Sequence, residues 1–434
     1  MGVGARRRHF GTDGIRGVVG DDLTPELVEK IGRAATLWAQ TAAKSERGSY
    51  PGRVLIGRDT RASGPVLEDA LARGIVSAGG TAVLAGVLPT PAVALLAERL
   101  GAMVSASHNP PEYNGVKLFA GDGRKLSDDE EEAVEALLEA PASNGGTVER
   151  VDDAAERYLR HVVDRFGSDL SGLRIAVDCA NGAFSALAPA VFERLGADVH
   201  AIGVDPDGTN INVGCGATAL ETLQQTVASR GLDLGVAFDG DGDRMLAVDE
   251  RGEPLDGDQI LAVLALSLGV DVVAVTVMTN LGFHRLMAES GIRVVTTPVG
   301  DRYVVEALRR EGGLLGGEQS GHVVWLGAHV AGDGLAAALL LCRSLAGRTL
   351  SEAASAMPRY PQAKRNVRVR SREIPQAILD EADRVTDELG DRGRVLVRAS
   401  GTEPVIRVLA EGETEEEAES ICASIAALVV KELG

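Results

Sequence analysis

The chain of 434 residues carries 63 acidic and 44 basic side chains, a net charge of −19, and hydrophobic and charged fractions of 45% and 25%. These fractions exclude a fibrous or disordered chain, and an acidic balance without a clustered basic patch argues against a nucleic-acid partner. The length exceeds one ordinary hydrophobic core, so several packed domains are expected.

The sequence shows no export signal and no clear membrane span. Arg6, Arg7 and Arg8 are followed by a polar segment where an apolar region would be required. The most apolar stretch, 260–278, is divided by a glycine and an aspartate, and we interpret it as a buried helix, a turn and a buried strand. The four cysteines are far apart and lack C-x-x-C spacing, which argues against disulfides or zinc. We therefore expect a cytoplasmic protein without membrane contact.

Short apolar runs alternate with longer stretches of helical periodicity, which is typical of βαβ units. In chain order the clearest elements are a helix over 25–42, a strand over 53–57, a helix over 127–138, strands over 173–178 and 272–277, and a helix that starts at Thr414. Strands that are apolar throughout favour a mostly parallel sheet covered by helices on both faces. The fold class expected from these elements is α/β.

Three turn-rich stretches, at 141–146, 251–254 and 358–361, are candidate domain boundaries. They predict α/β domains at 1–150, 151–254 and 255–361, and a smaller domain at 362–434. Each of the first three is about the usual size of a domain.

The strongest local signal is the run Asp239-Gly-Asp-Gly-Asp-Arg244, directly after an apolar segment. Three carboxylates at alternate positions can converge on one hard cation, for which Mg²⁺ is the natural choice. A calcium loop of the EF-hand kind would need glycine at the sixth position, where Arg244 stands, and helical flanks. A solvated acidic turn is the other interpretation.

The segment Ser105-Ala-Ser-His-Asn-Pro110 follows another apolar run and offers a nucleophile in Ser107. A serine must be activated by a base or a metal, and either His108 or the aspartate cluster could supply this. The alternative is a plain turn, because such residues dominate turns.

Cations set among glycines and hydroxyls provide candidate phosphate sites. They are Arg16, Lys117, and Arg398 and Arg407 around the segment Ala399-Ser400-Gly401-Thr402. A further glycine-rich loop contains Glu318, Ser320 and His322, which suits recognition of sugar hydroxyls or a general base. No P-loop pattern supports nucleotide binding.

In order along the chain, F-G-T-D-G-I-R-G, S-A-S-H-N-P, D-G-D-G-D-R, G-E-Q-S-G-H and R-A-S-G-T-E-P resemble the signature loops of the α-D-phosphohexomutase superfamily. The resemblance spans Phe10 to Pro404 and implies four domains around a central cleft, three of related α/β fold with mixed sheets and a C-terminal α+β domain. The sequence of the motif Glu318–His322, with Val299-Gly-Asp-Arg-Tyr303 upstream, most resembles that of the bacterial branch of the superfamily. Members of this branch interconvert glucosamine 6-phosphate and glucosamine 1-phosphate.

The resemblance implies that Ser107 is a phosphoserine and that Asp239, Asp241 and Asp243 hold Mg²⁺ together with its phosphate. Phosphate would pass to the substrate, giving a sugar 1,6-bisphosphate that reorients and returns its other phosphate to the serine. The substrate would be a phosphorylated hexosamine.

The remaining roles are implied in the same way. Arg16 and Lys117 flank the transferring phosphoryl group, and Glu318 and Ser320 contact sugar hydroxyls. His322 is the candidate general base. The second phosphate of the substrate is bound by Arg398, Ser400, Gly401, Thr402 and Arg407.

Three alternatives stay open at this point. One is a phosphomannomutase or phosphoglucomutase of the same superfamily, against which Gln319 favours the glucosamine substrate. Another is a non-catalytic sugar-phosphate-binding protein, and the third is a metal-dependent phosphatase. The sequence does not decide the oligomeric state, for which a homodimer is the candidate.

Overall fold

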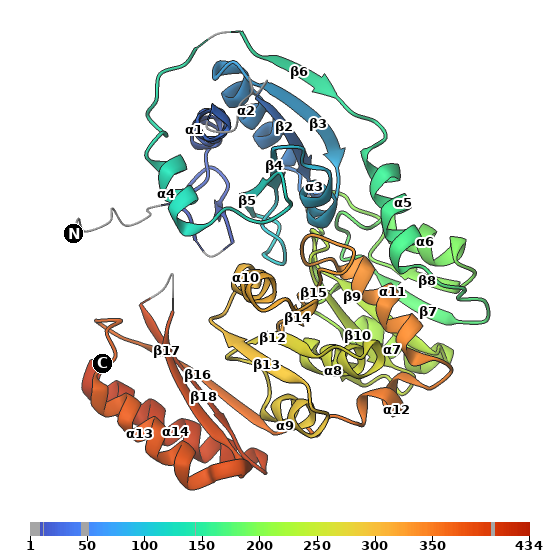
Figure 1. Ribbon diagram of the computed structural model, residues 1–434, viewed down its shortest axis with the longest axis vertical. Helices are drawn as coiled ribbons and strands as arrows, with labels where there is room; N and C mark the ends of the chain where they lie inside the picture. Colours follow the sequence, from blue (N-terminus) through green and yellow to red (C-terminus); the bar gives the residue numbers. More distant parts are fainter. Residues whose placement is uncertain (1–8, 12, 45–51, 144, 401–403) are drawn as a thin grey trace. The chain divides into compact units, whose positions relative to one another are not determined.

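The computed structural model describes residues 9–11, 13–44, 52–143, 145–400 and 404–434 (Figure 1). The chain forms two compact units. Unit 1 contains Met1–Val277 and Val295–Ala354, and unit 2 contains Met278–Val294 and Ser355–Gly434. Part of the expected third domain thus clusters with the C-terminal piece.

The first sheet of unit 1 has six strands in the order β1-β5-β4-β2-β3-β6. Its strands are β1 (Ile15–Val18), β2 (Arg53–Arg58), β3 (Thr81–Val87), β4 (Leu100–Val104), β5 (Tyr113–Ala120) and β6 (Thr147–Arg150). The associated helices are α1 (Pro25–Lys44), α2 (Gly64–Ser77), α3 (Thr90–Leu96) and α4 (Asp128–Glu135). Strands β4, β2, β3 and β6 are parallel, whereas β5 runs antiparallel to both β4 and β1.

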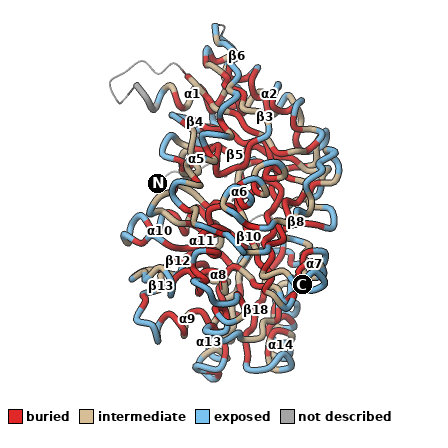
Figure 2. Tube along the Cα trace, turned by 90° about the vertical axis from the view of Figure 1, so that its right-hand side faces the viewer, coloured by how far each residue is buried: buried red, intermediate tan, exposed pale blue. Residues whose placement is uncertain are grey.

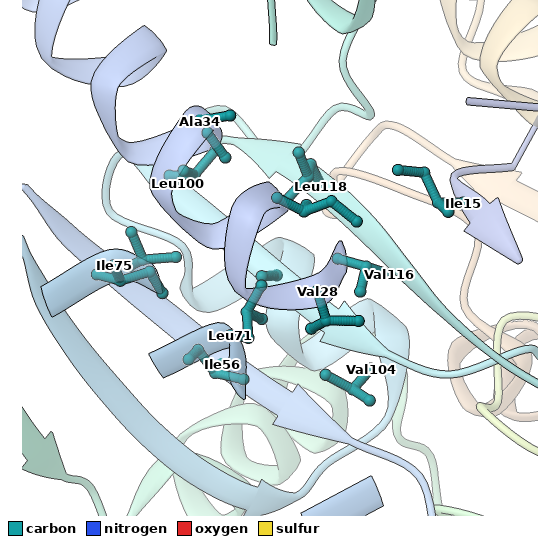
Figure 3. Packing of buried hydrophobic residues seen from close by; sticks show 14 of the residues in the cluster. Ile15, Val28, Ala34, Ile56, Leu71, Ile75, Leu100, Val104, Val116 and Leu118 are labelled. Carbon is teal, nitrogen blue, oxygen red and sulfur yellow. The ribbon is translucent and has the colours of Figure 1, made fainter. Parts of the chain in front are cut away.

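The core of this sheet lies under α1 and α2. Val28 of α1 and Leu71 of α2 are fully buried and belong to one cluster with strand residues such as Ile56 and Val116 (Figure 3). Figure 2 shows buried residues along β4 and β5 and exposed residues along β6, which matches their burial patterns. The loop that follows β4 therefore starts from a fixed, solvent-free strand.

The second sheet has the order β11-β10-β9-β7-β8 and the third has the order β13-β12-β14-β15. The second consists of β7 (Arg174–Asp178), β8 (Asp198–Ile202), β9 (Leu234–Phe238), β10 (Met245–Asp249) and β11 (Pro254–Leu255), with α5 (Ala154–Phe166), α6 (Ala188–Arg194) and α7 (Glu221–Arg230). The third consists of β12 (Val272–Thr276), β13 (Arg293–Thr297), β14 (Leu315–Gly317) and β15 (Val323–Trp325), with α8 (Gly257–Leu268), α10 (Asp301–Glu311), α11 (Gly334–Leu345) and α12 (Leu350–Ala354). Residues 295–297 of β13 belong to unit 1.

Unit 2 is built on a three-stranded antiparallel sheet in the order β16-β18-β17. Its elements are α9 (Leu281–Glu289), β16 (Gln362–Arg368), α13 (Gln376–Leu389), a 3-10 turn (Gly390–Arg392), β17 (Arg394–Ala399), β18 (Val405–Glu411) and α14 (Glu415–Leu433). Ile378 of α13, Ile406 of β18 and Cys422 of α14 are buried in one cluster between the helices and the sheet. This antiparallel sheet with its two packed helices agrees with the expected C-terminal α+β domain.

Several predicted elements are confirmed. Ser127 and Glu130 form a capping box at the start of α4, and the Thr414 side chain accepts a hydrogen bond from the Glu417 amide at the start of α14. The stretch 260–278 contains most of α8, a turn at Gly269 with φ 62°, and β12. None of the described helices has the length and hydropathy needed to span a membrane.

The apolar strands favoured mostly parallel sheets, which was wrong in part; the mixed sheets implied by the family resemblance are confirmed. In three places a strand from the parallel centre of a sheet turns through a loop into an antiparallel neighbour: β4 into β5, β9 into β10, and β14 into β15. A direct return through a short loop makes the next strand antiparallel, whereas a parallel strand needs a long crossover. These loops, 105–112, 239–244 and 318–322, contain most of the candidate site residues.

Gly74 allows the close packing of α1 on α2 and gives a first prediction. A Cβ atom at this position would lie 2.0 Å from the carbonyl oxygen of Glu29. We expect Gly74→Ala to lower the free energy of unfolding by about 1–3 kcal/mol, although alanine is the better helix former by about 1 kcal/mol. Urea unfolding followed by far-UV circular dichroism measures this change, with Asp69→Ala at an exposed position of α2 as the control. Unchanged stability of Gly74→Ala would contradict this packing.

Candidate active site

Ser107 lies in the loop after β4 and is fully buried. Its backbone has φ 54°, in the left-handed region that non-glycine residues rarely adopt. The Ser107 hydroxyl donates a hydrogen bond of 2.5 Å to Asp239 Oδ2 and lies 3.2 Å from His108 Nδ1. The loop thus directs the serine hydroxyl at the aspartate cluster of the second sheet.

Arg61 stabilises the loop that contains Ser107 through hydrogen bonds to its backbone. Its guanidinium donates to the carbonyl oxygens of Ser107 at 2.9 Å, of Asn109 at 2.8 Å and of Pro110. Asp59 fixes the guanidinium through a 2.9 Å bond from Arg61 Nε, and both side chains are fully buried. A buried guanidinium that is ion-paired and donates to several carbonyls keeps an unfavourable backbone conformation in place.

Asp239, Asp241 and Asp243 follow β9 and are buried, with one carboxylate oxygen of each within 4.8 Å of the others. Burial and the charges of Asp243 and Asp241 raise the pKa of Asp239 to about 7. Asp241 Oδ1 is buried without a hydrogen-bond partner among the described residues. Three hard oxygen donors, with Asp241 Oδ1 unsatisfied, fit a divalent cation such as Mg²⁺.

Two expected phosphate-binding cations lie beside these carboxylates. Lys117 of β5 is 1% exposed, and its Nζ donates to Asp241 Oδ2 at 2.7 Å and to Asp243 Oδ2 at 2.8 Å. Arg16 of β1 donates to Asn109 Oδ1 at 3.0 Å and pairs with Asp13. The carboxylates keep both side chains positively charged, since the pKa values of Lys117 and Arg16 rise despite burial.

The two candidate histidines have opposite charge states. Burial, Arg244 and Arg16 lower the pKa of His108 to about 3, so its ring is neutral. Burial opposes the charge of His322, but Asp243 at 3.1 Å and Glu318 at 2.9 Å raise the pKa of His322 to about 10. With this raised pKa, the His322 ring carries a positive charge between the two carboxylates.

The loop 318–322 is joined to the aspartate loop through the backbone. The Met245 amide donates to the Gly321 carbonyl at 2.9 Å, and Arg244 and His322 form an isolated antiparallel bridge. Glu318 is buried, and its Oε1 accepts a 2.9 Å hydrogen bond from the Gly300 amide, whereas Ser320 is exposed. Unit 1 thus brings together the loops of three sheets.

The candidate residues for a second phosphate belong to unit 2. Arg398 of β17 and Arg407 of β18 are direct partners in the antiparallel register, so their side chains lie on the same face of the sheet. Ser400 is buried directly after β17, and its carbonyl accepts a bond from Arg372 at 3.3 Å. Gly401 and Thr402 lie outside the described residues.

Sequence reasoning missed several residues that the structure brings to this site. Arg244 contributes its amide to Asp239 at 3.1 Å, and its Nε is buried without a hydrogen-bond partner within the described chain. Asp13 contacts Arg16 and Lys117, and Lys125 contacts Asp13. Asp13 and Arg244 belong to the motifs F-G-T-D-G-I-R-G and D-G-D-G-D-R, so their position beside other candidate residues could have identified them. Lys125 lies outside these motifs, and no sequence signal indicated its role.

Four family models match consecutive parts of the chain. They describe phosphoglucomutase/phosphomannomutase α/β/α domain I at residues 7–144, domain II at 156–252, domain III at 256–360, and the C-terminal domain at 365–428. Together they extend over most of the chain.

Curated relatives match over nearly their whole length. The phosphoglucosamine mutase of Moorella thermoacetica is 47% identical, with 96% of this chain and 98% of the relative covered. That of Symbiobacterium thermophilum is 48% identical, with 98% and 99% covered. That of Salinispora arenicola is 46% identical, with 96% and 97% covered.

Solved structures share the fold. A phosphoglucomutase/phosphomannomutase family protein from Burkholderia thailandensis has a TM-score of 0.82 at 25% identity, with 97% of both chains covered. The Aspergillus fumigatus N-acetylphosphoglucosamine mutase, in complex with GlcNAc-6P and magnesium, has a TM-score of 0.71 at 20% identity, with 97% of this chain and 95% of that chain covered.

The Asp59–Arg61 pair generates a prediction about the serine loop. Removing Arg61 leaves a buried carboxylate without its cation, so we expect Arg61→Met to cost about 3–5 kcal/mol of stability. In Arg61→Met, the backbone amides of residues 105–110 should also exchange their hydrogens faster than in the wild type. The double variant Asp59→Asn/Arg61→Met should lose less than Arg61→Met alone.

Arg58→Met is the matched control, because Arg58 is the last residue of β2, three positions before Arg61, and pairs with Glu68 at 3.4 Å. Chemical unfolding and hydrogen exchange measure all three variants. Equal effects of Arg61→Met and Arg58→Met would show that the loop does not depend on Arg61.

Proposed function

The chain belongs to the phosphoglucomutase/phosphomannomutase family, and we propose from this premise that it interconverts glucosamine 6-phosphate and glucosamine 1-phosphate. It is an enzyme, a phosphosugar mutase of the isomerase class. One observation carries the proposal for the chemistry: the buried Ser107 hydroxyl points at Asp239 within a cluster of three aspartates.

The choice of glucosamine rests on the curated relatives. Phosphoglucosamine mutases that are 46–48% identical cover at least 96% of this chain. Substrate selection in such sites depends on a few contacts to the sugar. In this proposal, Gln319, which follows Glu318 in the loop 318–322, determines the preference for glucosamine phosphate over other hexose phosphates.

Ser107 carries the phosphoryl group between turnovers. The bond between phosphorus and Ser107 Oγ breaks while a bond to the free hydroxyl of the sugar monophosphate forms, and the hydroxyl proton leaves to a base. The product of this half-reaction is a sugar 1,6-bisphosphate. After reorientation, the other phosphate returns to Ser107 Oγ and the opposite monophosphate is released.

Mg²⁺ would be held by Asp239, Asp241 and Asp243 together with a phosphate oxygen on Ser107. When bound, it supplies positive charge that stabilises the transferring phosphoryl group. The donor set fits the ion, because Asp241 Oδ1 is buried without a partner in the described part of the chain.

Arg16 and Lys117 supply the remaining positive charge at the site of transfer. A loose phosphoryl transition state spreads negative charge over its oxygens, and fixed cations stabilise it without reorganisation. In a protein of net charge −19 these local cations oppose the general repulsion of an anionic substrate.

Proton transfer and sugar binding fall to the loop 318–322. Glu318 and Ser320 bind sugar hydroxyls, and His322 is the candidate base for the attacking hydroxyl, with His108 supporting the Ser107 hydroxyl. His322 must first become neutral, which requires the charges of Asp243 and Glu318 to be balanced by cation or substrate.

The loop around Ser400 binds the phosphate that is not being transferred. Arg398 and Arg407 offer guanidinium donors on one sheet face, and Ser400, Gly401 and Thr402 complete the set in this proposal. A cytoplasmic location and a homodimer stay predictions.

The first test of this function follows the substrates by ³¹P NMR with Mg²⁺ and a trace of sugar 1,6-bisphosphate. Glucosamine 6-phosphate should be converted faster than glucose or mannose 6-phosphate, and Ser107→Ala should abolish conversion because the phosphate carrier is gone. Ser105→Ala removes a neighbouring hydroxyl that accepts a 2.9 Å hydrogen bond from the Ser107 amide, so it should lower turnover without abolishing it, because the phosphate carrier remains.

Three outcomes would change the assignment. Faster turnover of mannose or glucose phosphate would transfer the enzyme to another branch of the family. Net release of inorganic phosphate would indicate a phosphatase. Turnover of no sugar phosphate would leave only a binding function.

Metal dependence gives a second test. Chelation with EDTA should abolish turnover, and Mg²⁺ should restore it. Asp241→Asn should raise the Mg²⁺ concentration for half-maximal activity by about 10-fold or more. Saturating Mg²⁺ should also raise the melting temperature of the wild type, since a ligand at 100 times its Kd adds about 2.7 kcal/mol.

Asp233→Asn is the control, because Asp233 precedes β9 and pairs with Arg174 at an exposed position. The same Mg²⁺ response in Asp241→Asn and in the wild type would rule out this metal site.

A further inference from the structure

Lys125 is a buried cation that has no role in the proposed chemistry. It follows β5 in the turn before α4, and its side chain is 11% exposed. Its Nζ contacts two carboxylates that are far apart in sequence: Asp13, and Asp301 Oδ1 at 2.8 Å. Burial disfavours a charged lysine, so this position is costly unless both contacts compensate for it.

The first of these carboxylates, Asp13, leads into the cluster that faces Ser107. Asp13 is in contact with Arg16 and Lys125 and lies 3.3 Å from Lys117 Nζ. Lys117 in turn donates to Asp241 and Asp243 at 2.7 and 2.8 Å. One carboxylate therefore divides its charge among three cations, two of which are the proposed phosphoryl-binding residues.

The second carboxylate, Asp301, leads into the sugar loop. It is the first residue of α10, and the preceding Gly300 donates its amide to Glu318 Oε1 at 2.9 Å. Glu318 Oε2 lies 2.9 Å from His322 Nδ1. A continuous series of contacts thus runs from Lys117 through Asp13, Lys125 and Asp301 to the backbone that holds Glu318.

Docking of α10 against the first sheet does not explain Lys125. Arg302, which is 6% exposed, already joins α10 to this part of unit 1 by donating to the Leu126 carbonyl at 2.9 Å and to Glu131 at 3.4 Å. At the exposed end of the same contact, Arg309 pairs with Asp122 at 2.9 Å. Of these three cations, Lys125 is the one that contacts Asp13, which lies 3.3 Å from Lys117.

We propose that Lys125 is a positioning residue for phosphoryl transfer, which ties Asp13 to Asp301 and thereby aligns Lys117 and Arg16 with the sugar loop. Without this cation, Asp13 is free to turn fully toward Lys117 and Arg16 and draws their charge away from the phosphoryl group. Small displacements of preorganised charges lower the rate more than the affinity. The proposal rests on the mutase function proposed for this chain.

The test compares kcat and KM of the wild type, Lys125→Met and Lys125→Arg with glucosamine 6-phosphate, Mg²⁺ and bisphosphate. We expect Lys125→Met to lower kcat by about 10- to 100-fold, as for residues that orient reacting groups, with KM within about threefold of the wild type. Lys125→Arg keeps a cation that can reach both carboxylates and should recover most of the loss. Transfer of phosphate from phospho-Ser107 to substrate, followed by intact mass in a quenched reaction, should slow in the same proportion.

Two further variants separate positioning from docking. Arg309→Met removes an ion pair between the same two segments and should leave kcat unchanged. Asp301→Asn should lower kcat, and adding it to Lys125→Met should cause little further loss, because both act through one contact. If Lys125→Met does not fold, as judged by circular dichroism, Asp301→Asn and Lys125→Arg still carry the comparison.

The outcomes distinguish this proposal from the function on which it rests. A kcat of Lys125→Met within twofold of the wild type, an effect on KM alone, or equal losses in Arg309→Met would overturn the positioning role while the mutase function stands. If the wild type prefers another hexose phosphate, the same comparison is made with that sugar. A wild type that is inactive on all of them overturns both.

Discussion

The structure depends on the concentration of negative charge in one buried place. Three aspartates converge beside a serine that is expected to carry a phosphate, although each carboxylate is removed from water. Carboxylates in such a place repel one another and favour protonation, as the raised pKa of Asp239 indicates. Neighbouring cations offset this repulsion. Lys117 contacts Asp241 and Asp243, and Asp13 links Lys117 to Arg16 and Lys125.

The same structural solution recurs in each sheet of unit 1. A buried strand of the parallel centre ends at the site, makes a short loop, and returns as an antiparallel strand. Each loop tip therefore stands on two paired strands, which fixes it more firmly than the end of a single strand would. In unit 2, Arg398 and Arg407 likewise lie on paired antiparallel strands.

The sequence was informative wherever the signal is local. The capping box at Ser127, the turn at Gly269 and the alternating aspartates all depend on residues a few positions apart, so they could be predicted. The residues that hold the site loops in place could not be predicted from the sequence. Asp13 and Lys125 are separated by 112 positions, and Arg61 reaches carbonyl groups 46 to 49 positions away. Their roles come from burial and tertiary contact, and a single lysine or arginine in a sequence is most often a solvated surface residue.

The backbone of Ser107 also limits which residue can stand there. Serine and threonine have the same reactive hydroxyl, and chemistry alone would accept either as a phosphate carrier. At φ 54°, however, a side chain branched at Cβ is strongly disfavoured, whereas an unbranched one is tolerated. Backbone conformation rather than reactivity therefore distinguishes serine from threonine at this position. Loops with this backbone geometry would disfavour threonine even where no neighbouring side chain clashes with its methyl group.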